Sequence, residues 1–174
     1  TYVVEEKKGI LWVCTEEDGL FQINKTNNTI KNHKFSPLDP QSLSSNNFTN
    51  KQKNPLAFDS EGNLWIGTDN GLNFFNQSRG IFKRFFSKNN KTSISSNKIN
   101  TLYISDGTLW VGTPNGLDAI DVNTHKVERY AGSKWVSLIG MHNVLQIEPF
   151  KKGTTMEGFW MATIGGLVYF DKNM

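Results

Sequence analysis

Apolar residues along this chain come in short runs separated by polar turns, and the pattern returns every 45 to 53 residues. Each copy begins with Leu or Phe followed by Trp, continues to a Thr, and reaches a Gly-Leu pair a few residues later. The four copies start at Leu11, Leu64, Leu109 and Phe159. Repetition at this period predicts an array of small supersecondary units.

The third copy shows most clearly what one unit contains. Its apolar segments are interrupted by Asp-Gly and Pro-Asn-Gly, which are strong turn signals. The segments predict four strands at residues 99–104, 109–113, 117–120 and 126–130. Four short strands joined by tight turns form an antiparallel meander, and such sheets repeated at this spacing pack radially as β-propeller blades.

The sequence therefore predicts an all-β fold of about three and a half to four blades that forms part of a larger propeller. The blades are predicted at residues 1–36, 48–87, 98–131 and 143–174. We expect a long turn at residues 150–158, where the other copies have a tight one, and no outer strand in the fourth blade. Because the chain begins and ends inside the repeat pattern, we expect it to be an excerpt of a longer protein.

The second strand of each unit is apolar on both faces. Leu109 and Val111 point to one side in the third copy, and Trp110 and Gly112 to the other. We interpret the recurring tryptophan as packing between successive blades. The four positions are Trp12, Trp65, Trp110 and Trp160. The fourth strands carry Lys and Arg, which we interpret as protection of an exposed sheet edge.

Net charge, cysteine content and the length of apolar runs restrict the partners that we expect for this chain. The net charge of +3 is too small to indicate nucleic-acid binding. Cys14 is the only cysteine, so an intrachain disulfide is excluded, and we expect a small buried residue at its position. No apolar run approaches the roughly 18 residues of a membrane span. We therefore expect neither nucleic acid nor direct membrane contact.

Residues 64–76, Leu-Trp-Ile-Gly-Thr-Asp-Asn-Gly-Leu-Asn-Phe-Phe-Asn, resemble the two-component regulator propeller repeat. The Ser-Leu-Ser-Ser-Asn segment at 42–46 and its copy at 93–97 support the resemblance, as does Pro-Leu-Asp-Pro at 37–40. The resemblance implies the periplasmic sensor region of a Bacteroidetes-type hybrid two-component histidine kinase. Many members of that family sense oligosaccharides, and this chain contains only propeller blades.

In a four-stranded meander the turn after the second strand and the linker after the fourth open on the same face. Polar loops on a rigid scaffold commonly bind ligands, and amide, carboxylate and aromatic groups suit sugars. The candidate ligand-binding residues are Glu17, Asp18, Asn46, Asn47, Asp69, Asn70, Asn97, Asn115, Trp135 and His142. The alternative for each is a solvated turn residue that caps backbone groups.

An enzymatic role is not predicted, and neither is a cofactor or metal. The histidines His33, His125 and His142 occupy unrelated repeat positions without ligand spacing. Asp59-Ser60-Glu61-Gly62 contains only part of a calcium loop. Two functions remain open, a sensor segment that binds an oligosaccharide or transmits its binding, and a protein-interaction scaffold. As partners we expect an oligosaccharide and the remaining blades, and a homodimer for the chain alone.

Overall fold

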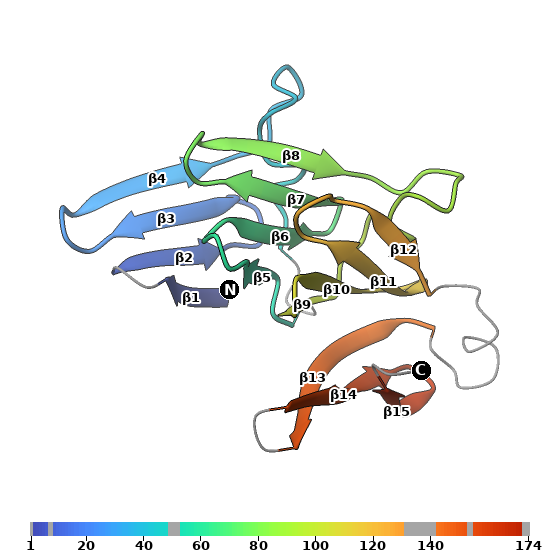
Figure 1. Cartoon of the computed structure of the whole chain (residues 1–174). Coiled ribbons are helices and arrows are strands. Elements are labelled where there is room, and N and C mark those ends of the chain that lie inside the picture. The colour runs from blue at the N-terminus through green and yellow to red at the C-terminus, as the bar shows by residue number, and fades with distance from the viewer. Residues whose placement is uncertain (1, 7–8, 49–52, 131–141, 153–154, 172–174) are drawn as a thin grey trace.

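A computed structural model describes residues 2–6, 9–48, 53–130, 142–152 and 155–171. These residues form strands and connecting turns, and none of them forms a helix long and apolar enough to span a bilayer. The strands make four antiparallel sheets, each a meander in which strands pair in chain order. The predicted all-β propeller architecture is confirmed (Figure 1).

The first two sheets have four strands each and are joined by residues 34–55. The first contains β1 (Tyr2–Glu6), β2 (Ile10–Cys14), β3 (Leu20–Asn24) and β4 (Thr29–His33). The second contains β5 (Leu56–Phe58), β6 (Leu64–Thr68), β7 (Gly71–Asn76) and β8 (Ile81–Phe85).

The third sheet has four strands and the fourth has three among the residues described. The third contains β9 (Thr101–Ser105), β10 (Thr108–Thr113), β11 (Gly116–Asp121) and β12 (Val127–Arg129). The fourth contains β13 (Val144–Lys152), β14 (Thr155–Thr163) and β15 (Gly166–Asp171). The four strands predicted for the third copy are thus confirmed to within two residues at every end.

The prediction of a long turn at residues 150–158 is wrong. β13 and β14 extend into this stretch, with Phe150 opposite Gly158 and a register shift before Lys151. The shift accommodates an extra residue as a β-bulge, so pairing continues past the point where the other sheets turn. Gly158 is needed within the strand, because a Cβ there would lie 2.1 Å from the carbonyl oxygen of Phe170.

Successive sheets pack face to face, and the same two faces meet each time. The tryptophan-bearing face of one sheet packs on the face of the next sheet that carries the Leu and Ile or Val of its second strand. Trp12 therefore lies with Leu64 and Ile66, and Trp65 with Leu109 and Val111. Trp110 and Leu117 pack in turn on the fourth sheet, against a set comprising Val144, Ile147, Phe159, Met161 and Val168.

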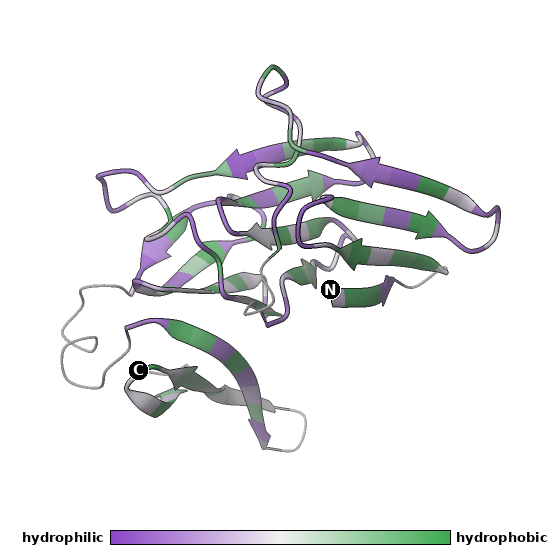
Figure 2. Ribbon diagram, turned by 180° about the vertical axis from the view of Figure 1, so that it is seen from behind, coloured by the Kyte–Doolittle hydropathy of each residue, from purple (hydrophilic) through white to green (hydrophobic). Residues whose placement is uncertain are grey.

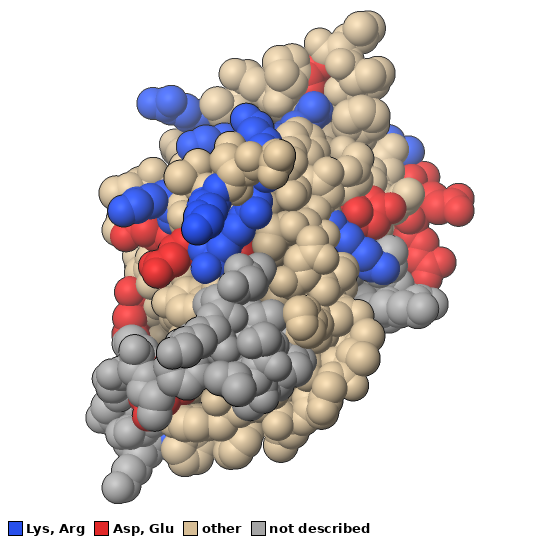
Figure 3. All heavy atoms as spheres, turned by 90° about the vertical axis from the view of Figure 1, so that its right-hand side faces the viewer, with Lys and Arg blue, Asp and Glu red and all other residues tan. Residues whose placement is uncertain are grey.

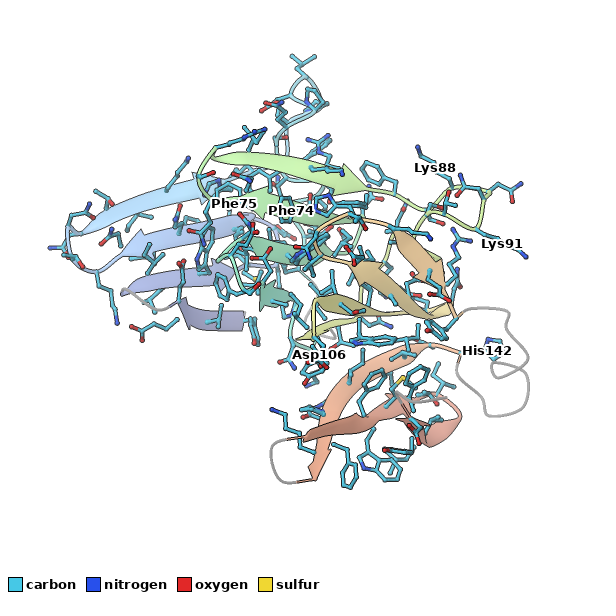
Figure 4. The ribbon with its side chains drawn as sticks, in the orientation of Figure 1. Phe74, Phe75, Lys88, Lys91, Asp106 and His142 are labelled. Atoms are coloured by element: carbon cyan, nitrogen blue, oxygen red, sulfur yellow. The ribbon has the colours of Figure 1, made fainter. Side chains whose placement is uncertain are left out.

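The predicted packing of the tryptophan column is confirmed for Trp12, Trp65 and Trp110, which are buried, and is wrong for Trp160. The side chain of Trp160 is 40% exposed because no sheet follows it among the described residues. First strands lie towards the middle of the arc and fourth strands at its rim (Figure 1). Neighbouring residues on a strand serve opposite interfaces, as Phe75 and Phe74 do on either side of β7 (Figure 4).

Candidate ligand-binding surface

The linker between the first two sheets is a wrapped loop held by its own side chains. The Ser42 hydroxyl accepts a hydrogen bond from the backbone N–H of Ser36 at 2.8 Å. The Asn46 side-chain oxygen accepts one from the N–H of Phe35 at 2.7 Å. Asn46 therefore caps the loop, which is the alternative role that the sequence left open for it.

The second linker repeats this arrangement in a loop that is one residue shorter. Ser93 accepts from the N–H of Lys88 at 2.9 Å, and Asn97 from the N–H of Ser87 at 2.7 Å. The Ser-x-x-x-Asn spacing common to both linkers is thus a structural motif. Apolar residues occupy most of the strands and polar ones the loops and turns (Figure 2).

An arginine from the outermost strand of the following sheet fastens each linker. Arg84 at the end of β8 donates to the carbonyl oxygens of Ser42 and Asp39, both at 2.7 Å. Arg129 at the end of β12 donates to the carbonyl of Ser93 and, at 2.6 Å, to that of Ile94. The sequence predicts edge protection for the cations of these strands, but the guanidinium groups of Arg84 and Arg129 bind the linkers.

Replacing Arg84 with Met is expected to lower the free energy of unfolding by about 2 kcal/mol, because hydrogen bonds from a charged donor contribute about 1.5–3 kcal/mol. Hydrogen exchange should accelerate at the amides of residues 36–43 and remain slow in residues 88–94. Arg129→Met is the matched control and should show the reverse pattern. Equal acceleration in both linkers would contradict a local clamp.

The turns after the second strands meet these linkers on one face, as the sequence predicts. The N–H of Gly19 donates to the carbonyl of Asn46 at 3.0 Å, and that of Gly71 to the carbonyl of Asn97 at 2.6 Å. In the third sheet the Asn115 side-chain amide donates to the carbonyl of Ser95 at 2.8 Å. The face formed by these turns and linkers is called the linker face below.

The candidate residues fall into three groups on this surface. Asn46, Asn97 and Asn115 hydrogen-bond to backbone, while Asp18 forms an ion pair with Lys34 and Asp69 accepts from the Ser45 hydroxyl. The remaining described candidates are exposed, as Asp18 and Asn115 also are, and they are Glu17, Asn47, Asn70 and His142. Trp135 lies outside the described residues.

Two buried polar residues at equivalent positions of the second and third sheets anchor the linkers, and neither is among the residues predicted from the sequence. Asn73 of β7 accepts from the N–H of Ser44 at 2.9 Å, and its amide donates to the Ser44 hydroxyl and to the carbonyl of Ile66. Asp118 holds the equivalent position in β11, where its Oδ2 accepts from the N–H and hydroxyl of Ser95 at 2.7 and 2.9 Å. The signal in the sequence is that both residues follow a Gly-Leu pair.

The carboxyl group of Asp118 is completely buried, and its Oδ1 has no hydrogen-bond partner within the described structure. Burial raises the pKa of Asp118 to about 6, although the hydrogen bonds from Ser95 and the charge of Arg129 oppose the shift. An amide suits this environment better than a carboxylate. At the position of Oδ1, which accepts no hydrogen bond, an amide would place an NH2 group that can donate one. The two linkers are thus anchored by different chemistry at equivalent positions.

Two hollows open beside these elements. One, of about 280 Å³, lies between the end of β8, the second linker and His125, and is bordered by Phe85 and Lys88. The other, of about 450 Å³, lies on the opposite face and is bordered by Glu6, Glu61 and amide side chains. Basic side chains gather on the side of the molecule shown in Figure 3, and Lys88 and Lys91 project from the second linker (Figure 4).

The histidines lie apart and two of them serve packing. His33 stacks on Trp12 with ring centroids 5.7 Å apart, and burial lowers the pKa of His33 to about 4. His125 packs edge-on against Phe74 with ring centroids 4.7 Å apart. Asp59 accepts the N–H groups of Glu61 and Asn63, and so caps its own turn.

The model of the two-component regulator propeller family matches residues 54–70 and 93–115. These segments include β5 and β6 of the second sheet and the end of the second linker with β9 and β10 of the third. No match was found among curated protein sequences.

Solved structures with the same fold come from larger proteins. The extracellular domain of a B. thetaiotaomicron protein described as a hybrid two-component system, BT3049, is 22% identical with a TM-score of 0.74. The match covers 98% of this chain and 22% of that one. The corresponding domain of BT4673 from the same organism is 20% identical with a TM-score of 0.66, over 99% and 20% of the two chains.

A computationally designed protein, Ika4, is 13% identical with a TM-score of 0.61, over 97% of this chain and 88% of that one. The chain thus spans about a fifth of the length of the two bacterial domains and most of the designed protein. At these identities the likeness establishes the fold. Together with the family match, it shows that the chain is a β-propeller segment that resembles two-component regulator propeller repeats at residues 54–70 and 93–115.

Proposed function

We propose that this chain is a non-catalytic segment of the extracytoplasmic, periplasmic sensor domain of a two-component receptor that detects an oligosaccharide. The observation that carries the proposal is the family match within two successive sheets. The similarity to extracellular domains described as parts of hybrid two-component systems supports it. In this proposal the histidine kinase is encoded elsewhere in the same gene.

The linker face is the proposed contact surface for the sugar. The exposed side-chain amides of Asn47, Asn70 and Asn115 belong to the linkers and turns of this face. Side-chain amides both donate to and accept from sugar hydroxyls. The linkers that carry them are fixed to the next sheet by Arg84 and Arg129. A ligand that presses on one linker would therefore act on two adjacent sheets at once.

The parent gene provides the first test. The proposal predicts a membrane-spanning segment and a histidine kinase in the reading frame that contains these residues. A reading frame that encodes propeller blades without either would contradict the sensor function. Such a gene would favour the alternative of a protein-interaction scaffold.

Ligand binding is tested by calorimetric titration of the complete propeller region with a panel of glycan fragments. A variant that combines Asn47→Ala, Asn70→Ala and Asn115→Ala is expected to bind the responding glycan at least about tenfold more weakly, which corresponds to 1.4 kcal/mol. Asn123→Ala, in an exposed turn of the opposite face, should leave affinity unchanged. Equal affinity in both variants would exclude the linker face as the contact surface.

A further inference from the structure

Positive charge is concentrated in one stretch of the chain. Between Asp69 and Asp106 the sequence contains six Lys and Arg residues and no Asp or Glu. The whole chain has 19 Lys and Arg and 16 Asp and Glu, so the rest of it is net acidic. The basic stretch includes β7, β8, β9 and the second linker, and it therefore belongs to the second and third sheets, which both have a neighbouring sheet on each side.

The hollow of about 280 Å³ beside β8 is bordered by residues of this stretch and by His125 and Val127. Its volume is close to the lower end of the range for ligand pockets, about 300 Å³, and suits a single sugar ring. Phe85 and Phe86 supply aromatic walls, and none of the bordering residues is acidic. The electron-rich face of an aromatic ring attracts the polarised C–H groups of a sugar, so these walls suit such a ring.

Two ammonium groups stand at the hollow. Lys88 borders it directly and is exposed to solvent. The Nζ of Lys83 lies 2.8 Å from Nδ1 of His125. Burial lowers the pKa of His125 and the charge of Lys83 lowers it further, although Asp121 and Asp59 oppose the shift. The imidazole therefore accepts the hydrogen bond as a neutral group, and the ammonium group of Lys83 keeps its charge.

Carboxylates do not neutralise these two lysines within the described structure. The salt bridges found there join Lys25 to Glu5 and Lys34 to Asp18, in the first sheet and the linker that follows it. An anionic ligand in the hollow would therefore meet two positive charges that are not already paired. Basic side chains gather on this side of the molecule (Figure 3).

The wall of the hollow is held in place by the protein itself. Arg129 donates to the carbonyl of Lys88 at 3.1 Å and to the Ser93 hydroxyl at 2.7 Å. Because the linker is already ordered, a ligand does not lose free energy in ordering it. Phe86 connects the hollow with the linker face, since a Cβ at Gly71 would lie 3.0 Å from Cε1 of its ring. An oligosaccharide on the linker face can therefore extend into the hollow.

We propose that this hollow binds an acidic sugar unit, one that carries a carboxylate or a sulfate group. The inference rests on the proposed function, because it specifies the chemical class of the oligosaccharide. The anionic group pairs with the ammonium groups of Lys83 and Lys88, while the sugar ring packs on Phe85 and Phe86. Charge complementarity then selects acidic glycans over neutral ones.

Calorimetric titration of the complete propeller region with two matched pairs of glycans tests the class of ligand. Trigalacturonate is compared with its uncharged methyl ester, and a sulfated galactan oligomer with its desulfated form. The charged member of at least one pair is expected to bind about tenfold more tightly, and its advantage should shrink as the salt concentration rises. Preference within the first pair identifies a carboxylate as the anionic group, and preference within the second identifies a sulfate.

The outcomes separate this inference from the proposed function. Binding of a neutral glycan, without a preference for charge in either pair, would overturn the inference and leave the sensor function intact. Failure of every glycan to bind would contradict both.

Substitutions locate the site. Lys83→Gln combined with Lys88→Gln is expected to weaken binding of the preferred acidic glycan about tenfold and to leave its uncharged counterpart unaffected. Lys31→Gln combined with Lys53→Gln is the matched control, since it removes the same charge from two exposed lysines outside the hollow. Equal weakening by the two variants would show that net charge alone governs binding and would overturn the site.

Discussion

Replacing Asp118 with Asn is expected to raise the free energy of unfolding at pH 7 by about 3 kcal/mol. The buried carboxyl has a pKa of about 6 in the folded chain, compared with an ordinary value of 3.8. A difference of this size corresponds to about 3 kcal/mol, since one pKa unit is 1.36 kcal/mol. Asn73 holds the equivalent position in the second sheet, and its amide donates an additional hydrogen bond to the carbonyl of Ile66.

The pH dependence has a definite sign. Because the folded pKa of Asp118 lies above the unfolded value, the folded state binds its proton more tightly. The contribution of the protonated Asp118 carboxyl group to stability is fully present below pH 3.8 and is lost as pH rises through about 6. The charged group facing Asp118 from the neighbouring strand is Arg129, its register partner in β12, which opposes the pKa shift.

Chemical denaturation at pH 4, 5, 6 and 7 measures the free energy of unfolding across this range. The original chain is expected to lose stability as pH rises, and Asp118→Asn should abolish most of that loss. Asn73→Asp provides the reciprocal control in the second sheet. It should introduce a comparable loss of stability between acid and neutral pH. Parallel pH profiles for the original chain and Asp118→Asn would show that Asp118 is not the responsible group.

Gly112→Val is expected to lower the free energy of unfolding by about 3 kcal/mol, at the upper end of the usual cost of overpacking. A Cβ at Gly112 would lie 2.6 Å from Cγ2 of Thr101 and 2.9 Å from Cγ1 of Val144. It would also approach the backbone oxygen of Val144 at 3.1 Å, which a side-chain rotation cannot relieve. The substitution should therefore separate the third sheet from the fourth.

Thermal and chemical unfolding measure this loss, and Cys14→Ala is the matched control. Cys14 holds the equivalent position in the first sheet, where a Cβ is already accommodated. Its replacement removes only the sulfur atom and should cost no more than about 1 kcal/mol, comparable to one buried methylene. Equal losses for the two variants would contradict the requirement for close approach at Gly112.

The repeat pattern was sufficient to predict the sheets because strand signals and turn signals agree, most clearly in the third copy. Leu109 to Thr113 reads as a strand from its apolar residues, and its Asp-Gly and Asn-Gly flanks fix where it begins and ends. The face shared by the linkers and the second turns follows from the meander topology alone. These features depend on local sequence, which a single chain displays directly.

Features that depend on contacts across the fold were not predictable in the same way. The clamp formed by Arg84 joins residues 42 or more positions apart, and nothing near it in the sequence indicates that partner. The sequence around Asn46 is equally consistent with a ligand-binding residue and a backbone cap. The hydrogen bond from the N–H of Phe35, which identifies a cap, is visible only in the structure. Trp160 repeats the motif of Trp65, yet its exposure depends on the absence of a neighbouring sheet in the described structure.

The central claim is that each tryptophan-bearing strand is held between successive sheets. Fluorine NMR of the chain labelled with fluorotryptophan tests it, with resonances assigned through Trp→Phe variants and a soluble paramagnetic agent as the probe of solvent contact. Trp12, Trp65 and Trp110 are predicted to keep sharp resonances when the agent is added. Broadening of any of these three to the extent seen for free fluorotryptophan would contradict the packing of the sheets.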